Sequence, residues 1–339
     1  MTSALRLIEG GTASGRWQVA TGAALVAEHV AGTAPDTLRT FRSPPTVLVG
    51  RHQATWDTIH MEACLADSVE VARRITGGGA VLLDRGSIGW EVMIARNRLP
   101  GVDLKAAIMD VATAARAGLA RHFGADAFPT GSVSGLFEGN TLAVQGFLRF
   151  AAPEMPENEY LASASADEQS QPLPETEIEI TQLLAGLAEG IALRFDLMPE
   201  AGSLTEHEMA KAQRHFEDDI GTDEFVFAID DPVETGLRIA THKSGESTTT
   251  VYLRTIWQDG IQRIAEATIV GDFIVCPARR VADLERAIEG QPVTEAPAII
   301  DRFFAGLDTD LALITAEDFK AAIAEAIAAT PRKDLMPIR

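Results

Sequence analysis

Cysteine is scarce in this chain of 339 residues. Only Cys64 and Cys276 are present, and no CxxC pair occurs. These numbers exclude a disulfide framework and a cysteine-rich zinc site. His207 and His215 lie in a helix-like stretch without the HExxH spacing of a zinc helix. We therefore predict no metal site built from protein residues alone.

Long apolar runs and basic residues are also few. No stretch approaches the roughly 18 apolar residues that a membrane span requires, and the first residues lack a signal-peptide core. Lys plus Arg number 29 against 49 Asp plus Glu, which gives a net charge of -20. Such a surface repels nucleic-acid phosphate and anionic lipid. We expect a cytoplasmic protein that binds neither nucleic acid nor membrane, with any anionic ligand held in a local pocket.

The chain is long enough for two domains, because a typical domain has about 150 residues. Its 46% hydrophobic and 23% charged residues are typical of a globular protein. Strand-like and helix-like patches alternate, which favours an α/β or α+β class. A new block of strands follows Gly221. We therefore predict one domain over residues 1–220 and a second over residues 221–339.

Local patterns predict the main elements of both domains. In the first we expect strands at 46–50, 69–73, 80–83 and 89–94, the last two forming a hairpin around 84–87, and helices at 104–123, 178–195 and 205–218. In the second we expect strands at 225–229, 237–242, 248–257 and 261–270, then helices near 281–289, 295–305 and 315–328. Asp259 and Gly260 predict a two-residue hairpin turn, and Thr315 predicts an N-cap.

Residues 151–180 differ from the rest of the chain. They contain four prolines and eight acidic residues, with no Lys or Arg. This composition predicts an acidic loop, which is either only solvated or a docking surface for a partner.

The most informative segment is RRITGGGAVLLDRG, residues 73–86. Three consecutive glycines at 77–79 lie between two strand-like runs, so a phosphate or carboxylate can lie directly against the peptide N–H groups. The segment is neither a Walker loop nor the dinucleotide GxGxxG motif. Arg73 and Arg74 face opposite sides of a strand, so one of them can point into a cleft and bind the anion.

These residues resemble the lipoate–protein ligase A family within the biotin and lipoate protein ligase superfamily. RRITGGGAV, preceded by TVLVGRHQ at 46–53 and followed by Asp84 and Gly86, matches the family pattern, and the segments 221–232, 264–290 and 314–323 are similar to its accessory domain. The resemblance implies an α+β fold, with a mixed-sheet biotin/lipoate protein ligase-like catalytic domain and a smaller α/β accessory domain.

The resemblance also implies an activity. Such proteins use ATP and Mg²⁺ to convert lipoate or octanoate into an acyl-adenylate and pass the acyl group to a lysine of a lipoyl-domain acceptor protein. It implies that the substrate and adenylate are bound by Arg51, His52, Arg74, Gly77, Gly78, Gly79, Asp84 and Asn140. Val81, Leu83 and Trp90 either line an acyl tunnel or pack in the core, and Gln53, Asp84 and Ser87 either serve the ligand or form turns.

The sequence departs from the family at one position of the reaction centre. Active ligases carry a lysine against the acyl phosphate, but after Asn140 and Gly146 the chain reads Phe147, Leu148, Arg149, with no lysine between 105 and 211. A missing cation weakens stabilisation of the negative charge in the transition state. Arg149 is the candidate substitute.

Two alternatives to the adenylating enzyme stay open. One is a catalytically degenerate family member that binds an acyl group or a lipoyl-domain partner. The other is an ATP-independent acyltransferase with a cysteine nucleophile, although neither Cys64 nor Cys276 occupies the position expected for it.

Overall fold

The computed structural model describes residues 3–124, 133–150, 154–162, 180–229, 236–245, 247–306 and 309–332. The strands are β1 Ser3–Thr12, β2 Asp36–Arg42, β3 Thr46–Val49, β4 Glu70–Arg73, β5 Val81–Leu83, β6 Ser87–Ala95, β7 Val133–Glu138, β8 Thr141–Arg149, β9 Leu197–Ala201, β10 Arg238–Ser244, β11 Ser247–Gln258, β12 Ile261–Gly271, β13 Ile274–Cys276 and β14 Asp310–Ala312. The α-helices are α1 Gly15–Val30, α2 Thr55–Thr58, α3 Met61–Ala66, α4 Leu104–Phe123, α5 Glu157–Tyr160, α6 Ile180–Phe195, α7 Glu206–Asp218, α8 Asp223–Val226, α9 Arg280–Ile288, α10 Ala296–Ala305 and α11 Ala316–Ala328. Short 3-10 turns cover Arg96–Arg98 and Val293–Glu295. None of the helices in these ranges is both long and apolar enough to cross a membrane.

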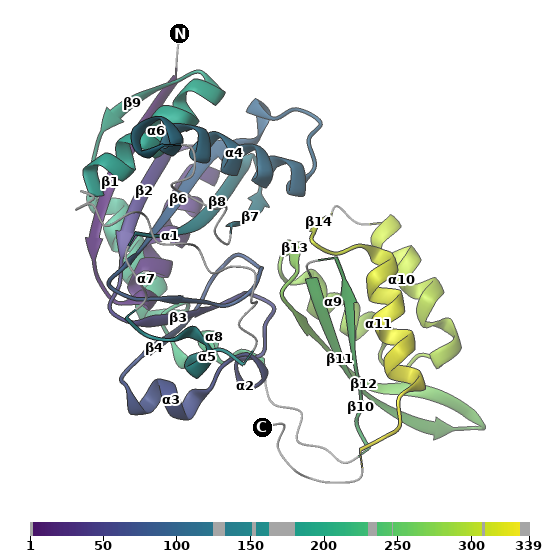
Figure 1. Ribbon diagram of the computed structural model, residues 1–339. Coiled ribbons are helices and arrows are strands. Elements are labelled where there is room, and N and C mark those ends of the chain that lie inside the picture. Colours follow the sequence, from purple (N-terminus) through teal and green to yellow (C-terminus); the bar gives the residue numbers. More distant parts are fainter. Residues whose placement is uncertain are drawn as a thin grey trace.

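A six-stranded mixed sheet forms the body of the first domain (Figure 1). Its strand order is β7-β8-β6-β2-β1-β9, with β1 parallel to β2 and β9 and the remaining pairs antiparallel. Helices α4 and α6 pack together and against the strands, and their apolar side chains join one large core. The predicted helix ends are present in α4, where Asp103 accepts a hydrogen bond from the Ala106 N–H at 2.8 Å and Gly124 ends the helix at a φ of 95°.

Helix α1 lies between the six-stranded sheet and a smaller sheet of order β4-β3-β5. Val19, Ala20 and Ala23 of α1 pack with Phe41 of β2 and with side chains of the smaller sheet. Every residue from 18 to 26 is buried. A helix buried on all sides has no polar face, so the sequence carries no helical periodicity by which α1 could be found.

The hairpin predicted around residues 84–87 is wrong, although its turn is present. Asp84 accepts hydrogen bonds from the Gly86 N–H at 3.0 Å and from the Ser87 hydroxyl at 2.9 Å. The flanking strands then separate, because β5 pairs with β3 of the small sheet and β6 pairs with β2 and β8 of the large one. A turn pattern predicts a change of chain direction but not which sheet each strand joins.

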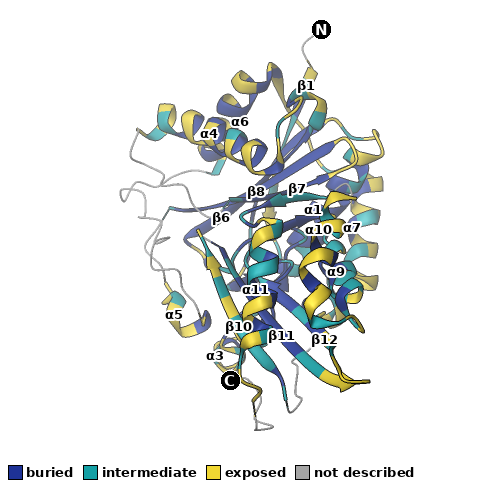
Figure 2. Ribbon diagram, turned by 90° about the vertical axis from the view of Figure 1, so that its right-hand side faces the viewer, coloured by how far each residue is buried: buried dark blue, intermediate teal, exposed yellow. Residues whose placement is uncertain are grey.

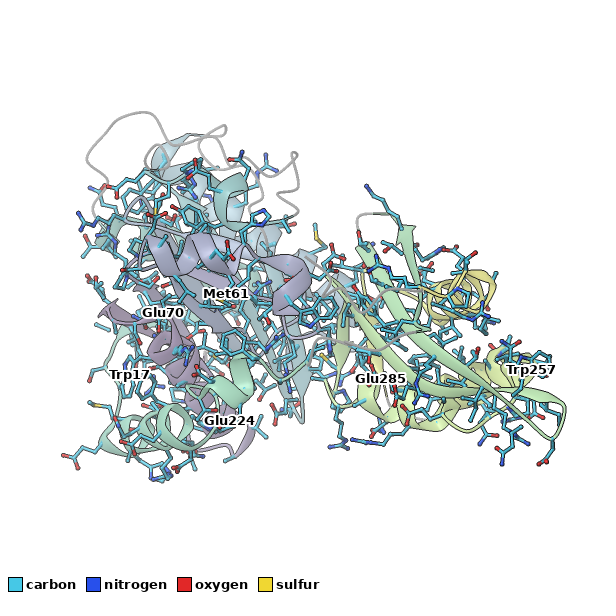
Figure 3. All side chains as sticks on the ribbon, turned by 90° about the horizontal axis from the view of Figure 1, so that it is seen from below. Trp17, Met61, Glu70, Glu224, Trp257 and Glu285 are labelled. Carbon is cyan, nitrogen blue, oxygen red and sulfur yellow. The ribbon has the colours of Figure 1, made fainter. Side chains whose placement is uncertain are left out.

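A separate three-stranded sheet, β10-β11-β12, forms the smaller C-terminal domain with helices α9, α10 and α11 (Figure 1). The predicted hairpin is confirmed, with φ of 52° at Asp259 and 75° at Gly260. Strands β11 and β12 are buried near the helices and exposed toward the hairpin turn (Figure 2). Trp257, which is 74% exposed, lies at the end of this domain farthest from the first domain (Figure 3).

The strand predicted at 225–229 is instead the short helix α8. Thr222 caps it by accepting a hydrogen bond from the Phe225 N–H at 3.3 Å, and Asp223 and Glu224 occupy its first turn. Figure 3 places Glu224 beside the first domain. Val226 packs there with strands β3 and β4. The α+β fold with a mixed-sheet first domain and a smaller C-terminal domain is thus confirmed, whereas the boundary at 220/221 stays a prediction.

Candidate functional site

Residues 77–79, the glycine loop, connect β4 to β5 next to the C-terminal domain. The Gly78 N–H donates a hydrogen bond to the Phe273 carbonyl at 3.2 Å, and the Ser134 hydroxyl donates to the Gly77 carbonyl at 2.7 Å. Gly78 has a φ of 88°, and a Cβ at Gly77 would lie 2.2 Å from the Phe273 carbonyl oxygen. The glycines therefore allow the loop backbone to touch the backbone of the other domain.

The two arginines before the loop are fully buried and have different neighbours. Arg73 donates to the carbonyls of Gly50 at 2.9 Å, Gln53 at 2.6 Å and Val226 at 2.9 Å. Burial lowers its pKa to about 10, so it stays charged at neutral pH. Arg74 donates to the Gly79 carbonyl and lies over the Phe147 ring, 5.6 Å from its centroid. Arg73 thus links the segment after β3 to α8 by hydrogen bonds, and Arg74 supports the glycine loop through its bond to the Gly79 carbonyl.

His52 lies in the segment after β3 and contacts the C-terminal domain. Its ring stacks on Phe273 with centroids 5.1 Å apart, and its carbonyl accepts a hydrogen bond from the Gly271 N–H at 3.0 Å. Burial, and then the charge of Arg51, lower the pKa of His52 to about 3. His52 is therefore a neutral packing residue of the domain interface at neutral pH.

A cavity of about 570 Å³ lies between the two domains beside the glycine loop. One part of its wall is apolar and comes from α1, β7 and the segment around β13. The lining residues are Ala23, Val26, Ala27, Arg51, Ile75, Gly77, Arg96, Leu136, Phe137, Glu138, Gly139, His215, Asp219, Ile220, Phe225, Val275, Cys276, Pro277, Ala278, Arg279 and Asp310. We name it the interdomain cavity. Its volume is within the range of small-molecule sites, roughly 300–1,000 Å³.

Charges of both signs line the interdomain cavity. Arg96 lies over the Phe137 ring at 3.8 Å from its centroid and is 3.4 Å from the Asp310 carboxylate. Arg51 lies over the Phe225 ring at 4.8 Å; burial lowers its pKa, and the nearby Asp219 opposes that effect. Among the described residues of this wall, every permanent cation is an arginine.

The structure brings only some of the predicted site residues to this cavity. Arg51 and Gly77 line it, and Gly78, Gly79 and Arg74 belong to the adjoining loop and its support. Asn140 lies in the exposed turn between β7 and β8, where its carbonyl accepts a hydrogen bond from the Arg96 N–H at 2.8 Å. The ligand roles of His52, Asp84 and Asn140 stay predictions.

Arg149 lies away from the glycine loop, in the core at the end of β8. Its guanidinium donates to Asp84 at 2.8 Å, to the Leu82 carbonyl at 3.4 Å and to Glu157 at 3.2 Å. Asp84 in turn accepts from the Glu154 N–H at 3.1 Å. These bonds hold Arg149 in a buried network, and a catalytic role for it stays a prediction that its contacts do not favour.

The remaining candidates make core or turn contacts, and their ligand roles stay predictions. Val81 and Leu83 pack with α1, and Trp90 belongs to the core of the large sheet. Gln53 accepts a hydrogen bond from the Gly50 N–H at 2.9 Å. The sequence did not predict Arg96 and Arg279 as residues of the cavity. Each lies outside the glycine-loop motif, and neither belongs to another motif.

Neither cysteine has the surroundings of a nucleophile. Burial raises the pKa of both thiols, that of Cys276 to about 12. Cys276 lines the interdomain cavity but is only 5% exposed. Within the described ranges, no group of three or more His, Cys, Asp or Glu could hold a metal ion.

Part of the first domain matches a known family model. Residues 14–135 match the model of the lipoyl protein ligase A/B catalytic domain. The octanoyltransferases LipM of Moorella thermoacetica and Kyrpidia tusciae are 38% and 34% identical over 80 and 98 residues, 23% and 29% of this chain. The mitochondrial lipoyl amidotransferase of Mus musculus is 34% identical over 61 residues, 18% of the chain. These matches span only 29%, 35% and 16% of the relatives' own lengths.

Solved structures share the fold at low sequence identity. LipL1 of P. falciparum in complex with lipoate aligns over 96% of this chain and 99% of its own, with a TM-score of 0.66 and 13% identity. The bipartite lipoate protein ligase of Thermoplasma acidophilum aligns over 68% of this chain and 100% of its own, with a TM-score of 0.57 and 17% identity. A lipoate-protein ligase A bound with ATP aligns over 66% of this chain and 98% of its own, with a TM-score of 0.57 and 18% identity.

Proposed function

We propose that this protein activates lipoate or octanoate with ATP to an acyl-adenylate and transfers the acyl group to a lysine of a lipoyl-domain protein. The interdomain cavity carries this proposal, because it joins an apolar wall to arginines and to the glycine loop. An amphipathic acid and a nucleotide phosphate need this combination. The family match of residues 14–135 supports the acyl class.

The reaction has two steps. A carboxylate oxygen of the acid attacks the α-phosphorus of ATP, and the bond to pyrophosphate breaks. The lysine amine then attacks the acyl carbonyl, AMP leaves with the bonding electrons, and the amine loses a proton. In this proposal Arg51 neutralises the phosphate and the apolar residues of α1 and β7 cover the acyl chain, because all of them line the interdomain cavity.

Carboxylates of this wall would hold Mg²⁺ together with the substrate phosphates. Protein sites usually bind Mg²⁺ through one or two carboxylates together with substrate phosphates. Asp219 and Asp310 line the interdomain cavity and would supply those oxygens. When bound, Mg²⁺ would screen the charge of the phosphates.

The glycine loop must part from the C-terminal domain before it can bind an anion through Gly78. In the structure the Gly78 N–H already donates to the Phe273 carbonyl. An incoming phosphate or carboxylate oxygen competes for that same donor. A bound anion therefore replaces the Phe273 carbonyl as the acceptor of the Gly78 N–H.

Exchange of radioactive pyrophosphate into ATP tests the adenylation step without an acceptor protein. We expect exchange that requires octanoate or lipoate, and a loss of at least tenfold in Arg51→Ala. Arg254→Ala, which removes an arginine that pairs with Glu266 on the distant hairpin, is the matched control and should keep full exchange. Absence of exchange in the folded wild-type protein would overturn the proposal.

Acyl transfer without ATP is the second candidate, and the identities to the two octanoyltransferases favour it. Its nucleophile would be Cys276, the cysteine that lines the interdomain cavity. A thiol with a pKa of about 12 is almost wholly protonated at neutral pH, which opposes this route. Octanoyl transfer from an acyl-carrier thioester in wild type, lost in Cys276→Ala and retained in Cys64→Ala, would establish it.

A further inference from the structure

A second, smaller cavity of about 20 Å³ lies on the sheet side of the glycine loop. It shares Val26 and Ile75 with the interdomain cavity, so these two side chains form the wall between them. The complete lining is Val19, Gly22, Val26, Ile75, Thr76, Glu91, Met93, Ala143, Val144 and Gln145. We name it the inner cavity. Its volume holds roughly one water-sized group, because a water needs about 10–15 Å³ by this measure.

The inner cavity is polar on one side. Glu91 of β6 is 5% exposed, and its carboxylate accepts a hydrogen bond from Arg39 at 2.6 Å. Arg39 is 1% exposed and also donates to the carbonyl of Gln18 at 3.2 Å. Burial raises the pKa of Glu91, and the charge of Arg39 opposes that rise. A buried ion pair thus lies beside a void that shares two lining residues with the interdomain cavity.

A polar side chain of the inner cavity lacks a hydrogen-bond partner within the described part of the chain. It is Thr76, whose hydroxyl is buried. Thr76 lines the inner cavity and directly precedes the glycine loop. A buried polar group without a partner is costly, and so is an alkyl chain placed against a desolvated ion pair. A small group that can both donate and accept hydrogen bonds would give Thr76 and Glu91 a partner in the inner cavity.

We propose that the inner cavity is a subsite for a polar substituent of the acyl group, and that Glu91 and Thr76 select acids that carry a hydroxyl or thiol over plain alkanoates. The inference rests on the proposed function, because the carboxylate of the acid must lie at the glycine loop. Glu91 accepts the hydrogen bond of the substituent, and the Thr76 hydroxyl donates to it. The acyl chain reaches the subsite by displacing the side chains of Val26 and Ile75.

Calorimetric binding of octanoate, 3-hydroxyoctanoate and 8-hydroxyoctanoate tests this assignment. A hydrogen bond to a charged group contributes about tenfold in affinity. We therefore expect one hydroxylated acid to bind about tenfold more tightly than octanoate. Glu91→Gln should reduce that advantage to less than threefold, and so should Thr76→Val, which leaves the Arg39 pair intact.

The control variant is Glu28→Gln, because Glu28 is a buried carboxylate on α1 that pairs with Lys211 and does not line the inner cavity. It should keep the wild-type preference. Equal affinity of the wild type for all three acids would show that the inner cavity holds only water, and would overturn the inference. Pyrophosphate exchange with the same acids separates the two claims. Exchange that shows no preference for a hydroxylated acid contradicts only the subsite. No exchange with any of the acids contradicts the proposed function.

Discussion

Arg149 and Arg39 are both buried in the first domain, and each meets a carboxylate, but their surroundings differ. Arg149 and Asp84 lie in a network that also bonds Ser87 and Glu157, and neither residue lines the interdomain cavity or the inner cavity. Glu91, the partner of Arg39, borders a void next to a ligand cavity, and the Arg39 Nε has no partner in the described residues. The comparison shows that burial and ion pairing alone do not mark a functional arginine. A void and an unsatisfied atom separate the two cases.

The largest expected effect comes from removing one carboxylate from each pair. Asp84→Ala leaves Arg149 charged without its main partner in a packed core, and we expect a loss of about 3–5 kcal/mol in the free energy of unfolding. Glu91→Ala should lose clearly less, because water can enter the enlarged inner cavity and solvate Arg39. Urea denaturation of the two variants measures the difference. Equal losses in the free energy of unfolding would contradict the difference between the surroundings of Arg149 and Arg39.

A buried carboxyl group without an arginine hydrogen-bond partner extends the comparison. Glu285 of α9 accepts a hydrogen bond from the Ile269 N–H at 2.7 Å, and burial raises its pKa to about 7. A raised folded-state pKa gives stability that is present below the unfolded value of 4.5 and lost as the pH rises to about 7.

Glu285→Gln should therefore match the wild type near pH 4.5 and exceed its stability near pH 8 by about 3 kcal/mol. Urea denaturation at the two pH values checks this. A variant that is less stable than the wild type near pH 8 would contradict the expectation.

His52 gives a pH dependence of stability opposite to that of Glu285, because burial lowers the pKa of a group that is charged when protonated. Its pKa of about 3 lies below the unfolded value of 6.5, so its contribution to stability is present above pH 6.5 and is lost as the pH falls toward 3. The wild type should lose about 2 kcal/mol between pH 7.5 and pH 5 through this group. His52→Phe keeps a ring against Phe273 and should show a correspondingly smaller loss. Identical pH dependence in both proteins would contradict the assignment.

Much of the fold could be predicted from local sequence patterns. Helices with one apolar face, such as α4 and α11, and the Asp259–Gly260 hairpin were all predictable, because each signal lies within a few neighbouring residues. Helix α1 and the pairing of β5 were not, since burial between two sheets and the choice of sheet depend on distant segments.

The site was predictable to a smaller extent. The glycine loop and Arg51 follow from the motif, and both border the interdomain cavity. The motif could not show that Arg149 bonds to Asp84, because Arg149 lies outside it and the two residues meet only through the packing of the sheets. Glu91 and Thr76 gave no signal either, since a cavity between α1 and two strands has no sequence pattern.

Under the proposed function, the bond between the Gly78 N–H and the Phe273 carbonyl makes the C-terminal domain an internal competitor for the proposed anion site. The observed dissociation constant of any anion at this donor is then the intrinsic constant divided by the fraction of molecules in which the contact is broken. Substitutions in the interface around Phe273 can thus tighten substrate binding without touching the substrate. Affinity in this protein is set partly by how firmly two of its own surfaces adhere.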